Sequence, residues 1–189
     1  MFMNVVVITG TPGVGKSTVL QRALEEIEEE YTILNFGDAM LKVALERGVV
    51  KNRDEMRMLD PGVQKDIQRM AARKIAGVAK TQNVVVDTHA QIKTHNGYLP
   101  GMPVWVLEQL MPRIIVVIEA DAAEIAGRRS SDTTRTRDVD TTTEIEEHQF
   151  MNKAAAVAYA VFTGATVAVI QNHDNRLDEA ARDLAVVLR

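Results

Sequence analysis

Residues 5–18 read VVVITGTPGVGKST, and this stretch decides the fold. Met3–Thr9 is an apolar, β-branched run, which predicts a buried strand. Residues 10–17 then match the phosphate-binding pattern G-x-x-x-x-G-K-[ST] at every defined position, and a helix is predicted from Lys16 to Glu30. Glycines let backbone N–H groups curl around phosphate oxygens, and the helix N-terminus adds the positive end of its dipole. The stretch therefore predicts a P-loop that holds ATP.

The residues of this loop have separate expected roles. Lys16 is expected to reach the β- and γ-phosphates, Ser17 to offer its hydroxyl to Mg²⁺, and Thr18 to bond the α-phosphate. The full set of predicted ATP-binding residues is Gly10, Thr11, Pro12, Gly13, Val14, Gly15, Lys16, Ser17 and Thr18. A chance glycine-rich turn is the alternative, and the placement between a strand and a helix argues against it.

Strands and helices alternate along the rest of the chain. Further strands are predicted at Tyr31–Phe36, Val84–Asp87, Ile114–Ala120 and Thr166–Gln171. Helices are predicted at Asp38–Arg47, Pro61 to about Lys80, Val104–Leu110, Ala122–Ser130, about Thr143 to Thr163, and Leu177–Leu188. Thr88–Pro103, with two glycines and two prolines, is predicted to be an ordered loop. The alternation indicates an α/β fold with a five-stranded parallel sheet and helices on both faces.

Length and composition limit the classes of function. The 189 residues suit a single domain, residues 1–189, and the absence of cysteine excludes disulfides and thiolate metal sites. A formal net charge of -4 argues against a nucleic-acid partner. The first apolar run is too short for a signal peptide or a membrane span, so we expect a cytoplasmic protein without a membrane partner.

Asp87 stands at the end of the third predicted strand. In P-loop proteins a carboxylate at the end of a neighbouring strand holds Mg²⁺ or its water, so Ser17 and Asp87 are the predicted metal ligands. A helix cap or turn is the alternative role for this aspartate. His89 follows two residues later and is the one histidine that we expect to line the site.

Four arginines fall within ten residues, just before or inside the polar stretch Ser131–Thr143, which has almost no apolar residue and cannot form core. We predict a lid near residues 128–143, with Arg128, Arg135 and Arg137 as catalytic cations that stabilise the transferring phosphoryl group. The fourth, Arg129, belongs to the same cluster. A solvated charged face, in which nearby aspartates pair with the arginines, is the alternative.

A second set of polar residues lies between the second and third predicted strands. Gly37, Asp38, Arg53 and Arg57 stand on segments that could hold a second nucleotide, within a helical insert near residues 37–80. A helical face stabilised by pairs such as Asp54 with Arg57 is the alternative.

Together these features resemble the adenylate kinases, of the archaeal type. The resemblance rests on Asn35-Phe36-Gly37-Asp38, Val86-Asp87-Thr88-His89, Gly97-Tyr98-Leu99-Pro100-Gly101, Arg128-Arg129, Arg135-Thr136-Arg137-Asp138, Glu146-Glu147-His148-Gln149 and Gly164-Ala165-Thr166. It implies a P-loop kinase fold with an ATP site, an AMP site and a lid, and the reversible reaction ATP + AMP ⇌ 2 ADP with Mg²⁺. It also implies a homo-oligomer, because archaeal members form trimers.

The chain departs from common bacterial and eukaryotic members of this family at two positions. Leu41 stands where they carry an arginine, and Thr88-His89-Ala90-Gln91 replaces their Gly-Phe-Pro-Arg. Two arginines for the AMP phosphate are therefore absent from their usual places, and Arg53, Arg57 or Lys93 are the candidates to replace them.

Other functions stay open at this point. A P-loop kinase for CMP, UMP or a non-nucleotide acceptor has the same donor motif. A nucleotide switch is disfavoured, because Asp87 does not begin an Asp-x-x-Gly pattern and no Asn-Lys-x-Asp guanine reader is present. A P-loop ATPase within a larger assembly would turn over ATP without any acceptor.

Overall fold

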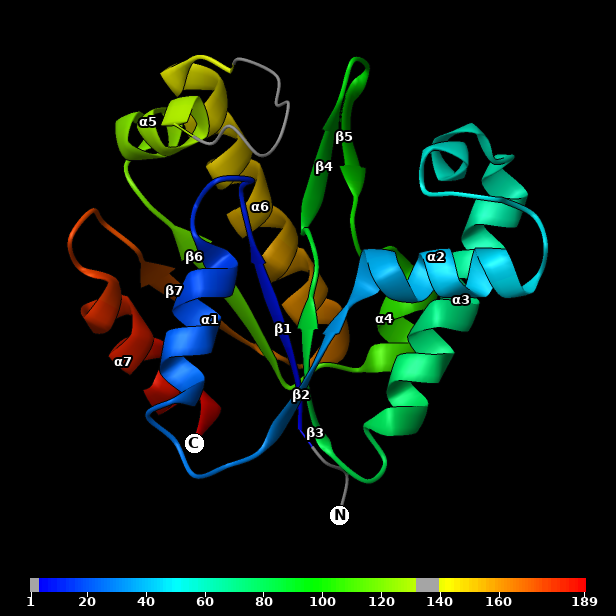
Figure 1. The fold of residues 1–189 in the computed structure, drawn as a ribbon, viewed down its shortest axis with the longest axis horizontal. Helices are drawn as coiled ribbons and strands as arrows, with labels where there is room; N and C mark the ends of the chain where they lie inside the picture. Colours follow the sequence, from blue (N-terminus) through cyan, green and yellow to red (C-terminus); the bar gives the residue numbers. More distant parts are fainter. Residues whose placement is uncertain (1–3, 132–139) are drawn as a thin grey trace.

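The computed structural model describes residues 4–131 and 140–189, and a parallel sheet lies at its centre (Figure 1). Its strands stand in the order β2-β3-β1-β6-β7, and every neighbouring pair is parallel. Their bounds are β1 Val5–Gly10, β2 Tyr31–Asn35, β3 Asn83–Asp87, β6 Ile114–Glu119 and β7 Thr166–Gln171. The predicted five-stranded parallel sheet is confirmed, and β1, which leads into the P-loop, is its central strand.

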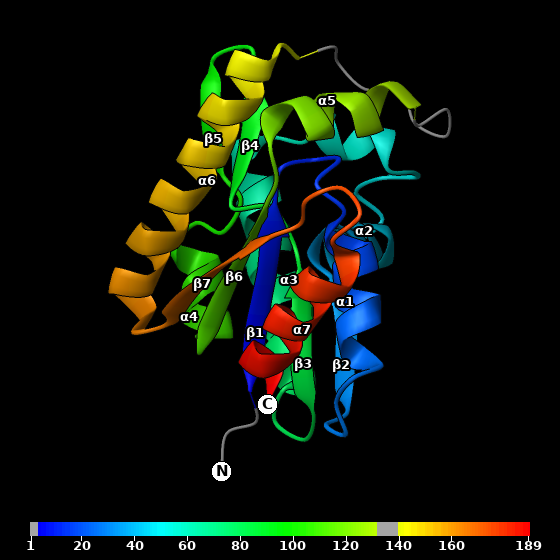
Figure 2. The same cartoon turned by 90° about the vertical axis from the view of Figure 1, so that its left-hand side faces the viewer.

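Helices cover both faces of the sheet (Figure 2). One face packs against α1 Lys16–Leu24, α5 Ala122–Ser131 and α7 Leu177–Leu188. The other face packs against α2 Phe36–Glu46, α3 Pro61–Val78, α4 Val104–Leu110 and α6 Thr142–Thr163. Strand β1 contributes to both cores, because Val5 and Val7 point to one face while Val6 and Ile8 point to the other. This explains why its sequence is a continuous apolar run and does not alternate with polar residues.

Two differences between predicted and observed helix boundaries have clear physical reasons. The first helix ends at Leu24 and not at Glu30, because three successive glutamates at a helix C-terminus would oppose its dipole. The second predicted helix begins earlier, at Phe36, where the Asn35 side chain accepts a hydrogen bond from the Asp38 N–H. The short charged stretch before α3 forms a 3₁₀ helix, η1 Asp54–Met58.

The prediction of a loop at Thr88–Pro103 is wrong for its central part, which forms a β-hairpin. Strands β4 Gln91–Thr94 and β5 Gly97–Pro100 pair antiparallel across the two-residue turn His95-Asn96. Gly97 follows the turn with φ of 115°, a left-handed value that side chains rarely adopt. Two strands of four residues, one ending in proline, give too weak an alternation to be recognised. The hairpin rises above the sheet beside α6 (Figures 1 and 2).

The helices of the described part of the chain include none that combines the length and the apolar character needed to span a membrane.

Candidate functional site

The P-loop connects β1 to α1 at the carboxyl edge of the sheet (Figure 1). Gly13 and Gly15 have φ values of 91° and 88°, so the turn needs glycine at both positions. Gly10 is required for a different reason, because a Cβ there would lie 2.7 Å from the carbonyl oxygen of Ile118 on β6. The local sequence therefore builds an open loop of backbone N–H groups at the start of a helix.

A cleft of about 500 Å³ opens over this loop. All nine predicted ATP-binding residues, Gly10 to Thr18, line it. Among the described residues, four from other elements also line it: Asn35, Asp87, His89 and Arg128. Predicted residues from three separate segments, namely the P-loop, the end of β3 and α5, therefore lie around one cavity.

Lys16 and Asp87 form an ion pair inside the cleft. The β1–β3 register brings them together, since Ile8 is the Cα partner of Asp87 at the carboxyl edge. The Lys16 Nζ also donates to the carbonyl oxygen of Thr88 at 3.0 Å. Both side chains are more than four-fifths buried, so the pair is shielded from bulk water and retains a larger electrostatic interaction than a surface pair.

Asn35 also contacts Asp87, which the site prediction missed. Its Nδ2 donates to the Asp87 Oδ2 at 3.3 Å, and Asn35 is the register partner of Asp87 in the β2–β3 pair. Its position as the last residue of the neighbouring parallel strand was the available signal, because the carboxyl ends of such strands meet at one edge.

Ser17 and Asp87, the predicted metal ligands, both line the cleft. They offer a hydroxyl and a carboxylate, which are hard oxygen donors of the kind that Mg²⁺ prefers. The residues present therefore fit Mg²⁺ brought in with a triphosphate.

Arg128 reaches the P-loop from α5. Its Nη1 donates to the Val14 carbonyl oxygen at 3.2 Å, and its Nη2 donates to the Asn172 carbonyl oxygen at 2.8 Å. The guanidinium also pairs with Asp174, at 2.6 Å from Nη2 to Oδ1. The described structure thus places this predicted catalytic cation at the mouth of the cleft, whereas Arg135 and Arg137 lie outside the described residues.

Arg129 joins the P-loop to the beginning of α6. Its Nε donates to the Pro12 carbonyl oxygen at 2.7 Å, and its Nη1 donates to the Asp140 Oδ2 at the same distance. Asp140 and Glu144 both bind Lys93 of β4, at 2.8 and 2.9 Å. Burial raises the pKa of Asp140, but hydrogen bonds from Lys93 and Arg129 outweigh it and leave the pKa below its ordinary value. Lys93, a candidate for the AMP phosphate, is thus engaged by two carboxylates.

Of the predicted acceptor-side residues, Gly37 and Asp38 lie on α2, Arg53 directly precedes η1 and Arg57 lies on it. These four are not among the described residues that line the cleft. Asp38 is in the first turn of α2 and forms an ion pair with Arg53. The Arg53 Nη1 lies 3.6 Å from the position that a Cβ on Gly37 would take, so this cation stands over the start of α2. Arg57 is exposed on η1. His89 lines the cleft, and burial lowers its pKa, which favours the neutral imidazole.

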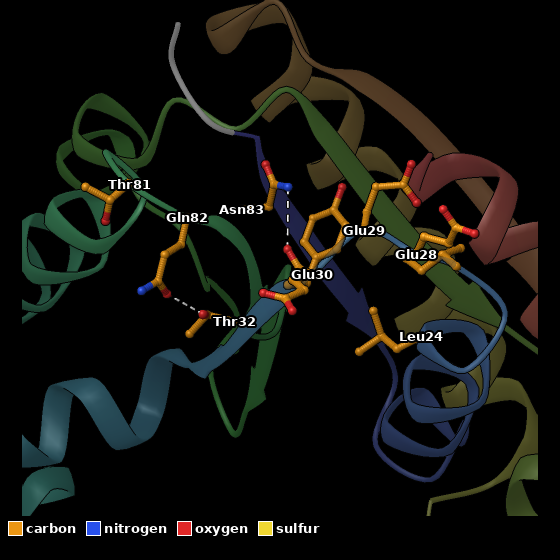
Figure 3. A pocket seen from close by; sticks show the side chains of 10 residues that line it. Leu24, Glu28, Glu29, Glu30, Thr32, Thr81, Gln82 and Asn83 are labelled. Carbon is orange, nitrogen blue, oxygen red and sulfur yellow. Dashed lines mark hydrogen bonds between the residues drawn. The ribbon is translucent and has the colours of Figure 1, made fainter.

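A larger hollow, of about 720 Å³, lies at the opposite edge of the sheet (Figure 3). Its polar lining comes from Glu28, Glu29 and Glu30 and from the segment Thr81–Asn83. Among the described residues that line it there is no lysine or arginine. Phosphate groups would meet only negative and neutral side chains there, so the hollow does not qualify as the nucleotide site.

Comparisons with known proteins agree with this geometry. A family model described as an AAA domain matches residues 9–146. A protein named adenylate kinase from Methanothermobacter thermautotrophicus is 54% identical over 186 residues, which cover 98% of this chain and 100% of that protein. Adenylate kinases from Methanocaldococcus jannaschii and Methanococcus vannielii are 54% and 52% identical, each with 98% of both chains covered.

Solved structures with the same fold have much lower sequence identity. A shikimate kinase from Acinetobacter baumannii superposes with a TM-score of 0.58 at 15% identity, over 98% of this chain and 90% of that one. A shikimate kinase from Bacteroides thetaiotaomicron gives 0.55 at 14% identity, over 98% of both chains. At such identities the likeness establishes the α/β kinase fold alone.

Proposed function

The chain carries an AAA domain and belongs to the adenylate kinase family, and from this premise we propose that its P-loop cleft transfers the γ-phosphoryl group of ATP to AMP with Mg²⁺. The convergence of Lys16, Asp87 and Arg128 on one cleft carries the proposal. This convergence supplies a phosphate cradle, a cation and an oxygen donor for the metal, which phosphoryl transfer needs together.

On the donor side, the residues of this chain would bind the phosphates of ATP and neutralise their charge. Backbone N–H groups of the loop and the Lys16 ammonium would hold the phosphate oxygens, and Lys16 would exchange its partner Asp87 for them. That exchange would free the Asp87 carboxylate, beside the Ser17 hydroxyl, to hold Mg²⁺ or its water. Mg²⁺, when bound, neutralises charge on the β- and γ-phosphates. Arg128, and Arg135 and Arg137 of the proposed lid at residues 128–143, would stabilise the charge of the transferring group.

On the acceptor side, we propose that the insert at residues 37–80 binds AMP. Gly37 and Asp38 lie in the first turn of α2, Arg53 pairs with Asp38 from the position before η1, and Arg57 lies on η1. His89 would face the phosphates from the end of β3. In-line transfer requires the AMP phosphate to be held against the γ-phosphate, so at least one of these cations must turn toward the cleft.

We also propose that copies of this chain associate, as trimers by family resemblance, in the cytoplasm where ATP and AMP are exchanged. The outer side of α6 supports the association, because Phe150, Val157 and Val161 are exposed on it by 66%, 54% and 83%. A long apolar stripe on a surface helix is typical of an interface. Light scattering on Val157→Asp measures this directly: a smaller mass than the unaltered protein is expected, and an unaltered protein that is already monomeric contradicts it.

A coupled assay of ADP formation with AMP, CMP, UMP and GMP tests the activity. We expect AMP to be the preferred acceptor and turnover to require Mg²⁺. Equal rates with CMP or UMP would point instead to a kinase of broader acceptor range, and ATP hydrolysis without any acceptor would point to an ATPase.

A further inference from the structure

The segment that leads from β3 into the hairpin is held by side chains as well as by backbone hydrogen bonds, such as the one from the Gly101 N–H to the Ala90 carbonyl oxygen at 2.8 Å. We call residues Thr88–Gln91 the strap. The Ala90 N–H donates to the Thr9 Oγ1 at 2.6 Å, and the Ala90 carbonyl oxygen accepts from the Tyr159 hydroxyl at 2.8 Å. The Gln91 carbonyl oxygen lies 3.2 Å from the His148 Nε2, which must be the donor because a carbonyl only accepts. Helix α6 therefore supplies two of these bonds, from Tyr159 and from His148.

Asn152 of α6 supplies a further bond to the strap and also reaches the P-loop. Its Oδ1 accepts from the Gln91 N–H at 3.0 Å, and its Nδ2 donates to the Thr11 Oγ1 at 3.3 Å. Asn152 and Thr11 are each only 1% exposed. Both ends of one buried amide thus connect the strap to the phosphate-binding loop, with no water needed between them.

The two parts joined in this way both contribute to the cleft. The P-loop provides the phosphate cradle, while the strap provides the Thr88 carbonyl oxygen that accepts from Lys16 and the His89 side chain. Gly101 packs against the strap so closely that a Cβ there would lie 1.8 Å from the His89 carbonyl oxygen. The strap can therefore shift little on that side.

We propose that Asn152 is a positioning residue for phosphoryl transfer, which sets the spacing between the P-loop and the strap through Thr11 and Gln91. The inference rests on the proposed function, because it assigns a task within the same cleft. Asn152 touches no substrate in this scheme and acts through the residues that do. A displacement of one ångström in such a frame can lower a rate by about a hundredfold.

The test breaks the link from each end and compares both with a matched control. Asn152→Ala removes the amide, and Thr11→Val removes the buried hydroxyl at nearly constant shape. Tyr159→Phe is the control, because it deletes one buried hydrogen bond to the same strap while the Ala90 carbonyl oxygen keeps its bond from the Gly101 N–H at 2.8 Å. For each variant and for the double variant Thr11→Val/Asn152→Ala, the kcat, the KM values, the Tm and the calorimetric Kd for ATP are measured.

We expect kcat to fall about tenfold or more, and the Kd for ATP to rise at least about threefold, in both single variants. The double variant should be no worse than the poorer single one, because both changes cut the same link. Tyr159→Phe should lower the Tm about as much as the two single variants do. Its kcat and its Kd for ATP should nevertheless stay within about twofold of those of the unaltered protein.

Single variants that match the control, or losses that multiply in the double variant, would overturn the inference. If Asn152→Ala does not fold, Asn152→Ser, which cannot bond the strap and the P-loop at the same time, takes its place in the same comparison. An unaltered protein that forms no ADP from ATP and AMP would refute the proposed function. The calorimetric Kd values for ATP would then still show whether the contacts of Asn152 position the P-loop.

Discussion

The two edges of the central sheet carry opposite kinds of hollow. The P-loop cleft at the carboxyl edge measures about 500 Å³, while the hollow at the amino edge is larger, about 720 Å³. Backbone N–H groups, Lys16 and Arg128 line the first, whereas three glutamates contribute to the second. Size therefore does not identify the site here, and the sign of the electrostatic potential does.

Chain direction explains the difference. In a parallel α/β sheet every strand ends at the same edge, and the helix that follows begins there with free N–H groups. Helices α1 and α3 end at the other edge, at Leu24 and Val78, close to the glutamate-lined hollow. The backbone dipoles of the helices thus make one edge of the sheet attractive to phosphate and the other repulsive, independently of the side chains.

The largest effect is expected at Lys16. Lys16→Ala should lower kcat about a thousandfold while the protein stays folded, because the lysine neutralises phosphate charge and is not part of the apolar core. Lys80→Ala, the same substitution in an exposed lysine just after α3, is the control and should keep kcat within about twofold. Circular dichroism checks folding. A folded Lys16→Ala protein with near-normal turnover would show that the cleft at the carboxyl edge is not the site of phosphoryl transfer.

The next largest effect concerns the proposed lid. Arg128→Ala and Arg135→Ala should each lower kcat about a hundredfold if they stabilise the transferring phosphoryl group. Arg182→Ala, on the outer side of α7, is a control for loss of an exposed arginine. Unchanged kcat in both lid variants would assign the stretch at residues 128–143 to a solvated charged face.

Substitutions on the proposed AMP-binding side should change mainly the KM for AMP. We expect Arg53→Ala and Arg57→Ala to raise the KM for AMP about tenfold, because a charge-assisted bond to phosphate is lost, and to leave the KM for ATP unchanged. Steady-state kinetics with each nucleotide varied in turn separates the two. A variant pair in which only the KM for ATP changes would place these cations on the donor side.

A smaller effect is expected in the dependence of stability on pH. Hydrogen bonds from the Thr141 N–H, from Lys93 and from the Thr141 hydroxyl lower the pKa of Glu144 from its ordinary 4.5 to about 2. Between these values the unfolded chain binds more protons than the folded one, so the stabilisation is complete above pH 4.5 and is lost as the pH falls toward 2. The Tm of the unaltered protein should therefore fall more steeply over this range than that of Glu144→Gln. Parallel curves would show that the contacts of Glu144 do not stabilise the fold.

The smallest effect is expected at the amino edge. The triple variant Glu28→Gln/Glu29→Gln/Glu30→Gln should keep kcat and both KM values within about twofold, because these side chains lie at the edge away from the P-loop. A loss of activity at unchanged Tm would show that the larger hollow takes part in function.

Much of this molecule could be predicted from its sequence, for identifiable physical reasons. The P-loop, the parallel sheet and Asp87 follow from local patterns, since a buried strand, a glycine turn and a helix start are each fixed by a few adjacent residues. Asn35 and Asn152 were missed, because their roles depend on register and on helix packing across more than fifty residues. The hairpin was missed because its short strands lack a clear alternation. The acceptor-side assignments and those of Arg135 and Arg137 stay predictions.

The strand order also bears on how the protein is made. Strand β1 has β3 and β6 as its neighbours, so Val5 pairs with Val84 and Val6 with Ile114. At roughly 5–20 residues per second, a ribosome needs on the order of ten seconds to reach the second of these partners. During this interval the apolar strand β1 lacks at least one of its two neighbours in the sheet, which is when chaperones bind such segments. A message that ends before β6 would yield a polypeptide containing every P-loop residue and no formed cradle.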